Sequence, residues 1–582
     1  MKKRKMEKVR LVSRLKEKCI KVAIYISCLF LLLPNVISQG LIKNLELVGD
    51  PFYTSRIKQF SLFSFDLAQL YVLNNSINEG KAEIFSLSEL LMSKINLILN
   101  VGASNLYIIS SILIVFLILL VFEKILKEFK VSNKLAIITV VICLFLLWGP
   151  YFPYSLERPI SPQVIILIWA IYLHLCIIGI KRTSTQNSIL MGLIAGISLY
   201  LHYPYLFLQI QVGTICFIIL MYCLKIPIKG FVASVIISLI LSVPAIFWSL
   251  RARQLNEYQE LLLRGGLITN HIPSAINTLV IGIIALVLFN RILQRKPKPI
   301  DHRLFIGYLF FCSHVIANIA LANSNFITGV SLQFSDHFEV FVKVLLVIAI
   351  VLFLNQLTII KGSMIFTRKK QFEFFLSISL LVLSISYIKS VSDQENYSTT
   401  FQKEIDLIKE RIPANAALIL DDNGIADIGG ALLTNPLLTN TNIMNYAFSQ
   451  KEINQRYFAN SGCTITQIDN TSYSHMYGFR IISEERKLVR VYKFLKQIDL
   501  FDGYKESLSK KIDLLNLELD MLKAQIQNDF AEVSHYGCIK FIKDRNIQFI
   551  ISQKPNNWNS YSKNGEILFI DSLSSLSLYR VN

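Results

Sequence analysis

The polar residues of this chain that are best suited to chemistry fall in four connections between apolar segments. A carboxylate in such a connection can accept a proton from a hydroxyl group, and arginine or histidine can neutralise an anionic leaving group. In chain order, the candidate side chains are Asp50, Arg56, Glu157, Arg158, His202, Tyr203, Asn325, Gln333, Asp336 and His337. If the four connections emerge on one side of a membrane, these residues would form a single reaction site there.

Each connection also has a structural interpretation. Asp50-Pro51 is an ordinary turn and helix-capping signal, in which aspartate accepts backbone hydrogen bonds and proline fixes the backbone. Glu157 and Arg158 are equally explained as an ion pair at the membrane surface. Tyr203 fits an aromatic residue at headgroup depth, the interpretation that we favour for it. The fourth connection crowds polar side chains between two apolar segments, which packing alone explains less well.

The elements that must position these residues are membrane-spanning helices. Of the 582 residues, 53% are hydrophobic and 17% are charged, and the apolar stretches are long enough to cross a hydrocarbon core of about 30 Å. This composition excludes a soluble globular protein. The sequence predicts about eleven spans, near residues 19–38, 105–122, 134–150, 163–180, 188–202, 205–224, 230–249, 275–294, 304–321, 338–360 and 372–389.

The charges between the spans predict the orientation. Residues 1–18 form a basic amino terminus, followed by an apolar run that is too long for a typical signal core and lacks an Ala-x-Ala end, so we predict an uncleaved first helix. Starting with this terminus in the cytoplasm, alternation makes five connections cytoplasmic. All five are basic, and they are residues 123–134, 181–182, 225–229, 291–303 and 361–370. The net charge of +19 is therefore read as a topology signal rather than as a sign of nucleic-acid binding.

The same alternation places the tail outside the cytoplasm, and we expect a multi-pass protein of the bacterial cytoplasmic membrane. The first external loop, residues 39–104, is long enough to contain a helix of its own. Apolar residues recur there at helical spacing, at Ile84, Leu87, Leu91, Ile95 and Ile98. The opposite face is polar and carries Ser86, Glu89, Ser93 and Asn100. Such a helix either lies in the membrane interface or packs on the bundle, and the pattern favours neither.

Residues 391–582 have a mixed, more polar composition, which predicts a small extracytoplasmic α/β domain. Short β-type runs occur at residues 417–420, 548–552 and 567–570. An apolar seam in steps of four and three runs along Leu508, Ile512, Leu515, Leu519, Leu522 and Ile526. Because the seam is shorter than three heptads, we predict a helix contact within the chain rather than a dimeric coiled coil.

Cysteine and histidine use is sparse. The tail contains Cys463 and Cys538, and a disulfide between them requires an extracytoplasmic tail and a short Cα distance, which the sequence does not establish. His174 and His314 are single histidines within spans, the kind that is more often a hydrogen-bonded core residue than a proton relay. No Cys/His spacing indicates zinc, and no certain cofactor follows from the sequence; a single carboxylate is a poor divalent-metal site.

At this point the sequence resembles a known group. Asp50-Pro51-Phe52-Tyr53 followed by Arg56 looks like the aspartate segment in the first external loop of the GT-C superfamily of integral membrane glycosyltransferases. The pattern that joins Asn325, Thr328, Gly329, Gln333 and His337 is similar to a segment in large bacterial membrane proteins of the same layout. The resemblance covers residues 19–390. A Trp-Trp-Asp motif does not occur, so oligosaccharyltransferase activity is not expected.

The resemblance implies transfer of a sugar from a polyprenyl-phosphate-linked donor to a glycan or lipid acceptor of the cell envelope, at the extracytoplasmic face. It implies that Asp50 is the general base and that Arg56, Arg158 and His337 contact phosphate. Three alternatives stay open, namely a transporter or flippase of lipid-linked glycans, a polysaccharide polymerase or ligase, and a non-catalytic scaffold for the tail domain. A transporter would be expected to carry ionisable residues at mid-bilayer depth.

Overall fold

The structure is a computed structural model, and it describes an amino-terminal helical bundle and a carboxyl-terminal domain. In the first part it describes residues 22–26, 29, 33, 87–147, 163–182, 184–201, 205–252, 280, 282, 287, 302–328, 338 and 341–352. In the second part it describes residues 402–414, 416–421, 426, 433, 435, 437–438, 449–465, 488–490, 492–493, 496, 502–573 and 576–582.

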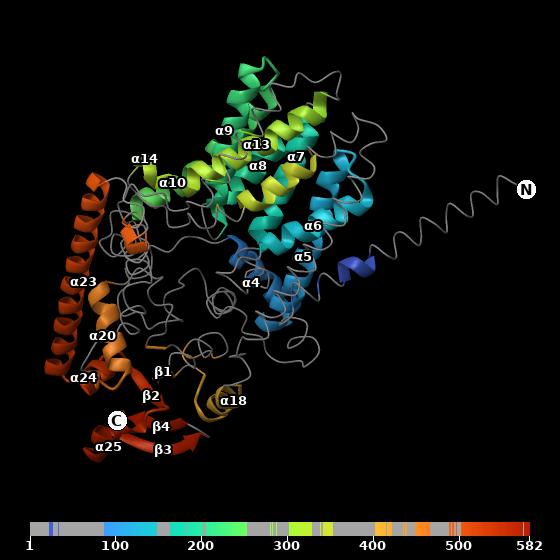
Figure 1. The fold of residues 1–582 in the computed structure, drawn as a ribbon. Coiled ribbons are helices and arrows are strands. Elements are labelled where there is room, and N and C mark those ends of the chain that lie inside the picture. Colours follow the sequence, from blue (N-terminus) through green and yellow to red (C-terminus); the bar gives the residue numbers. More distant parts are fainter. Residues whose placement is uncertain are drawn as a thin grey trace, which may run out of the picture.

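Apolar helices dominate the first part (Figure 1). They are α4 (Leu87–Leu99), α5 (Ala103–Glu128), α6 (Asn133–Leu147), α7 (Ile165–Lys181), α8 (Thr185–Ile197) with the 3-10 turn η4 (Ser198–Tyr200), α9 (Tyr205–Cys223), α10 (Lys229–Ala252), α13 (His302–Ala322) and the single turn α14 (Asn325–Thr328). Within the described residues, four helical stretches are long and apolar enough to cross a membrane, namely Asn105–Glu128, Tyr205–Cys223, Lys229–Phe247 and Phe305–Ala322. The shorter apolar helices Ile165–Lys181 and Phe341–Leu352 accompany them.

These helices coincide with predicted spans, with one difference at the end of α5. The sequence placed residues 123–134 in a connection because they are charged, but the helix continues to Glu128. The charges are paired: Glu123 accepts a hydrogen bond from Tyr25 and forms an ion pair with Lys127, and Glu128 pairs with Lys181. Pairing allows the charges to remain on a helix. The predicted spans at 275–294 and 372–389 lie almost entirely or entirely outside the described residues.

Contacts between helix ends give the direction of each helix. Lys181 Nζ donates to Glu128 Oε2 at 2.7 Å, so α5 and α7 end together and therefore run in parallel. Only three residues separate α7 from α8, so α8 returns to the end where α5 and α7 begin, and α9 starts there. We call this the α4 end of the bundle, because α4 packs on the beginning of α5 through Met92 and Ser110.

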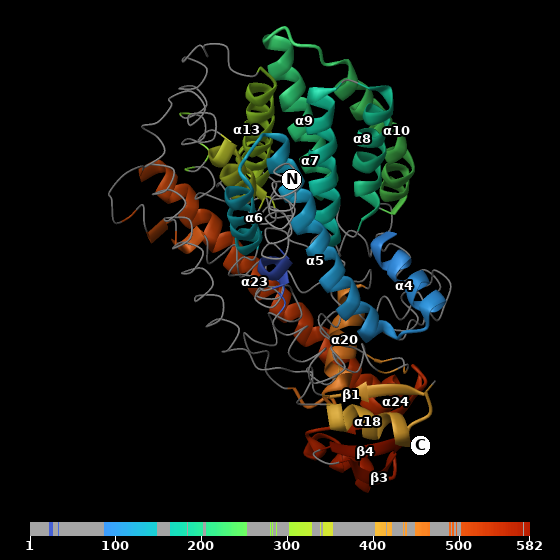
Figure 2. The same ribbon diagram turned by 90° about the vertical axis from the view of Figure 1, so that its right-hand side faces the viewer.

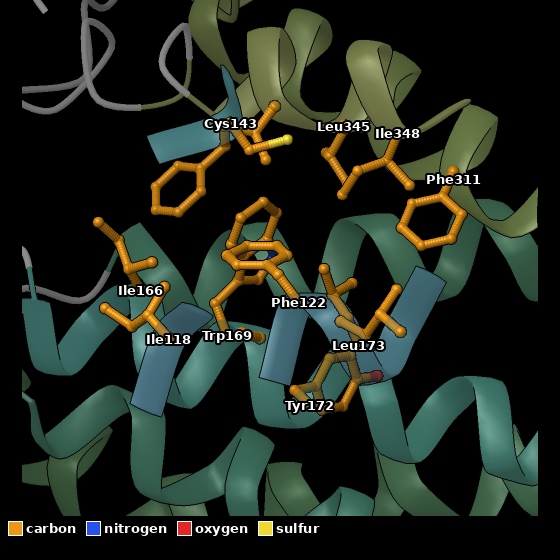
Figure 3. Close-up of a cluster of buried hydrophobic side chains, with 14 of the residues drawn as sticks. Ile118, Phe122, Cys143, Ile166, Trp169, Tyr172, Leu173, Phe311, Leu345 and Ile348 are labelled. Atoms are coloured by element: carbon orange, nitrogen blue, oxygen red, sulfur yellow. The ribbon is translucent and has the colours of Figure 1, made fainter. Parts of the chain in front are cut away.

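The bundle core is a continuous apolar cluster (Figure 3). At its centre lies the fully buried Trp169 of α7, whose ring centroid is 5.9 Å from that of Phe122 and 4.6 Å from that of Phe341, both in edge-on geometry. Leu345 and Ile348 approach from the helix Phe341–Leu352. Edge-to-face packing of this kind stabilises aromatic side chains beyond the burial of their area. It joins α5, α7 and the helix Phe341–Leu352 into one unit.

Helices α8 and α10 approach closely because α8 presents two glycines one turn apart. A Cβ atom on Gly192 would lie 2.7 Å from Ile237 Cβ and 2.9 Å from the Ser234 carbonyl oxygen. A Cβ atom on Gly196 would lie 2.7 Å from Leu241 Cβ. Small residues four apart are the usual means by which membrane helices come into backbone contact.

Replacing Gly192 with leucine should therefore force α8 and α10 apart. We expect a loss of about 1–3 kcal/mol or more in stability, the usual effect of overpacking, measured as a lower thermal unfolding midpoint in detergent. Leu193→Phe is the control, because Leu193 lies next to Gly192 and is 37% exposed. Equal midpoints for the two variants would show that the close approach of α8 and α10 is not required.

The carboxyl-terminal part is an α/β domain with a four-stranded sheet in the order β1-β2-β4-β3. Its strands are β1 (Ala417–Leu420), β2 (Ile547–Ser552), β3 (Ile567–Leu573) and β4 (Leu576–Val581). Its helices are α18 (Gln402–Arg411), α20 (Gln450–Asn460), α23 (Asp502–Tyr536), α24 (Cys538–Lys543) and α25 (Asn559–Lys563). The 3-10 turn η7 (Pro555–Asn557) precedes α25. Strand β1 is parallel to β2, and the other two pairings are antiparallel. The three predicted β-runs are confirmed as β1, β2 and β3, whereas β4 was not predicted.

Both faces of the sheet are covered. Side chains of β1 alternate between two clusters, with Ile419 on the face that contacts α20, α23 and α24, and Leu418 on the face of α18. The predicted seam of α23 packs within the chain, since Ile526 is fully buried beneath α20 and Leu508 is 1% exposed beside Leu488. The expected intramolecular helix contact is thus confirmed. Figures 1 and 2 both show the sheet on the side of the bundle where α4 lies.

A disulfide joins Cys463, just after α20, to Cys538, the first residue of α24, with their Cα atoms 6.1 Å apart. The two cysteines are 75 residues apart in sequence, and the long helix α23 lies between them. The sequence left this pairing open.

A nearly buried ion-pair cluster connects α20 to Arg545, which lies just after the end of α24. Glu452 accepts hydrogen bonds from Arg456 at 2.7 Å and from Arg545 at 2.8 and 2.9 Å. Arg456 is fully buried. Burial alone would raise the pKa of Glu452, but the two guanidinium groups outweigh it and hold the pKa below its usual value. The stabilisation is therefore present at neutral pH and is lost as pH falls below about 4.5, through the lower pKa of the folded state.

Replacing Glu452 with glutamine should leave two guanidinium groups without their counter-charge. We expect the free energy of unfolding of the domain to fall by about 3 kcal/mol, measured by denaturant titration at pH 7. Glu532→Gln is the matched control: it removes a pair with Lys451 in which both side chains are 53% exposed, so the cost should stay below about 1 kcal/mol. Similar losses in the two variants would contradict the assigned role of the cluster.

Candidate functional site

Of the ten predicted site residues, Asn325 lies within the described part of the chain. The other nine lie outside the described residues, and they are Asp50, Arg56, Glu157, Arg158, His202, Tyr203, Gln333, Asp336 and His337. The structure nevertheless describes the helix ends that carry their connections.

The four connections attach to the same end of the bundle. The first leads into α5, the second into α7 and the third into α9, and all three helices begin at the α4 end. Helix α13 runs opposite to α9, because Gly213 meets His314 and Phe217 meets Phe310. It therefore finishes at the α4 end, where α14 and the fourth connection follow. Each of the four connections therefore adjoins a described helix end at the α4 end of the bundle.

Helix α4, from the first of these connections, has an inverted burial pattern. Its apolar residues Leu91, Ile95 and Ile98 are exposed, and Ile98 is 81% exposed. Its polar residues Glu89 and Ser93 are fully buried. A helix in water buries its apolar face, whereas a helix in contact with lipid turns that face outward. The exposed apolar face of α4 therefore fits a position at the membrane interface, and its polar face packs on the bundle. The two interpretations that the sequence left open are thus compatible with each other.

Several polar side chains of α4 and α5 are buried, among them Glu89 and Ser93 of α4 and Ser110 and Ser111 of α5. Ser110 Oγ lies 3.5 Å from Met92 Sδ, which shows how closely the two helices approach. Glu89 is fully buried, and it is a carboxylate within the first predicted external loop. The sequence treated it only as part of a polar helix face, although an acidic residue in that loop was itself a signal.

Asn325 begins α14, directly after α13, and it is 1% exposed. The sequence expected a polar loop here, but residues 325–328 form a helical turn, in which Thr328 Oγ1 donates to the Ser324 carbonyl oxygen at 2.9 Å. This turn directs Asn325 inward and leaves Ile327 and Thr328 exposed. Asn325 therefore belongs to the bundle's α4 end rather than to a solvent-exposed loop.

In the carboxyl-terminal domain, Asp421 follows β1 at the edge where the parallel strands β1 and β2 both end. It accepts hydrogen bonds from Ser552 Oγ, from the Gln553 amide at 2.9 Å and from Trp558 Nε1 at 3.3 Å. Burial raises the pKa of Asp421, and these donors oppose the rise. Because its carboxylate oxygens already accept hydrogen bonds, we assign Asp421 a structural role, in which it holds the ends of β1 and β2 together.

Among the described residues, no group of three histidine, cysteine, aspartate or glutamate side chains is arranged to hold a metal ion. The sequence was also compared with known proteins. No protein-family model matches it. No curated protein matches it either.

Proposed function

We propose that this protein is a membrane glycosyltransferase that moves a sugar from a polyprenyl-phosphate-linked donor to a glycan or lipid acceptor of the cell envelope. The observation that carries the proposal is the common attachment of four polar connections to the α4 end of the bundle, beside a helix whose apolar face is exposed. A lipid-linked donor keeps its phosphate at the membrane interface, so groups that act on it must lie at helix ends.

The proposed roles follow from the chemistry of glycosyl transfer. Asp50 takes the proton of the acceptor hydroxyl, and Arg56, Arg158 and His337 neutralise the departing phosphate. The remaining candidates bind substrate, and they are Glu157, His202, Tyr203, Asn325, Gln333 and Asp336. The proposed architecture is a GT-C-like bundle of about eleven spans.

The proposed orientation places the α4 end and the carboxyl-terminal domain outside the cytoplasm of a bacterial cell. Two observations support it. The connection at the opposite end between α7 and α8 carries Lys181 and Arg182, as cytoplasmic connections typically do. The disulfide between Cys463 and Cys538 is of a kind that persists in oxidising compartments.

A transporter of lipid-linked glycans is the second candidate, favoured by a fully buried histidine, His314, inside the candidate span Phe305–Ala322. Reconstitution of the purified protein into liposomes with a labelled polyprenyl-phosphate sugar distinguishes the two. A transferase moves the label onto an added acceptor, whereas a transporter changes only the leaflet in which the intact donor is found. Movement of intact donor without transfer would reject the first proposal, and the length of the labelled product would identify a polymerase.

A further inference from the structure

Helices α9 and α13 face each other in a register that two contacts determine. A Cβ atom on Gly213 would lie 2.1 Å from Nδ1 of His314, so the imidazole occupies the space that glycine leaves. Phe217 lies four residues after Gly213 in α9, and Phe310 lies four residues before His314 in α13. Their ring centroids are 5.2 Å apart. The same step in the other direction places Gln209 opposite Asn318, one helical turn nearer the α4 end.

Three side chains at this interface are fully buried, namely Gln209, His314 and Asn318. Among the described residues, five of their polar atoms have no hydrogen-bond partner: both amide atoms of Gln209, both ring nitrogens of His314 and Oδ1 of Asn318. The amide nitrogen of Asn318 donates to the His314 carbonyl oxygen at 2.7 Å. His314 is thus a core residue, as expected, but its ring has no hydrogen-bond partner among the described residues.

Neighbouring polar residues of α9 do find partners across helices. Tyr172 and Thr214 share a hydrogen bond of 2.6 Å, and Gln211 donates to Ser238 Oγ at 2.6 Å. Other buried atoms of the described bundle also have no partner, among them Trp169 Nε1, His174 Nδ1 and Gln211 Oε1, but at the interface of His314 five such atoms belong to three side chains in register. A buried polar group without a hydrogen-bond partner lowers the stability of the folded protein, and inside a bilayer no bulk water can supply the missing hydrogen bond.

We propose that Gln209, His314 and Asn318 form a binding site for water inside the bundle. Together the three side chains offer both hydrogen-bond donors and acceptors, which suits water, because a water molecule both donates and accepts hydrogen bonds. A buried water needs two to four polar partners, and five atoms are available.

Gln209→Met tests the site by thermal unfolding of the full-length protein in detergent. If the interface is dry, the substitution removes two buried polar atoms that have no partner, and the unfolding midpoint should rise. If water is bound, the substitution removes hydrogen bonds to it, and the midpoint should fall. We expect a fall of a few degrees, larger than in Ile210→Met, a volume-conserving change at the neighbouring buried residue. A midpoint equal to or above that of the unchanged protein would overturn the proposal.

Cysteine accessibility supplies a second measurement that does not depend on stability. The background protein keeps Cys463 and Cys538 and has its free cysteines replaced. Asn318→Cys and Ala317→Cys are each introduced into this background and compared. Ala317 is fully buried one residue away and points elsewhere on the helix. A small water-soluble thiol reagent should modify the first at least about ten times faster, because thiolate forms only where water reaches it. Equal rates would overturn the proposal.

Discussion

Replacing Asp50 with asparagine should reduce sugar transfer by about a hundred- to ten-thousand-fold, the usual contribution of a positioned general base. The substitution keeps nearly the same volume and removes the proton acceptor. Expression and donor binding should persist, because the phosphate contacts proposed for Arg56, Arg158 and His337 do not involve Asp50. The measurement is turnover in liposomes with a labelled polyprenyl-phosphate donor, alongside donor binding by the same preparation.

Asparagine is more informative here than alanine. If Asp50 only caps a helix or turn, asparagine caps almost as well and the variant should be nearly silent, whereas alanine would harm a cap and a catalyst alike. Normal turnover in Asp50→Asn would remove the strongest residue-level argument for a transferase and would favour the transporter.

Glu89→Gln gives a comparison within the same loop. Glu89 is a fully buried carboxylate on α4, so it is the natural alternative base. A collapse of turnover in Glu89→Gln with normal turnover in Asp50→Asn would move the base from Asp50 to Glu89 and leave the reaction class unchanged. Loss in both would require the two carboxylates to act together.

Much of the architecture could be predicted from local pattern. The apolar stretches of α9 and α13 are uniform and long, and the isoleucine-rich run of β2 is bounded by polar residues, so hydropathy alone locates them. Strand β4 was missed because its sequence, Leu-Ser-Leu-Tyr-Arg-Val, mixes polar and apolar residues, and the strand is defined by its pairing with β2 and β3. The extension of α5 was missed because pairing between Glu128 and Lys181, distant in sequence, was not visible.

The site was less accessible to prediction, for a physical reason. An amphipathic pattern such as that of α4 predicts that the two faces of the helix differ. It does not predict which face turns inward, because this depends on whether water or lipid surrounds the helix, so the burial of Glu89 was not predicted. Likewise His314 appeared isolated in sequence. It acquires Gln209 as a neighbour only through the antiparallel register of α9 and α13, and no local pattern contains that register.

Removing the Cys463–Cys538 disulfide should lower the free energy of unfolding of the carboxyl-terminal domain by about 4 kcal/mol, since a cross-link over 75 residues restricts the unfolded chain strongly. The bond joins the end of α20 to the start of α24, and Glu452 of α20 also binds Arg545, just after α24. Its effect should therefore appear as one cooperative loss, measured by denaturant titration of Cys463→Ser with Cys538→Ser.

The same bond reports the side of the membrane. In intact cells Cys463 and Cys538 should resist thiol labelling until a reductant is added. The labelling of Cys216, a free and partly exposed cysteine of the bundle, should not depend on the reductant. Reporter fusions supply the independent check: those after Lys130 and Lys370 should behave as cytoplasmic, and one at Asn396 as extracytoplasmic. A cytoplasmic signal at Asn396, with both cysteines freely labelled, would reverse the orientation of every connection. Asp50 would then lie on the wrong side for an external lipid-linked donor.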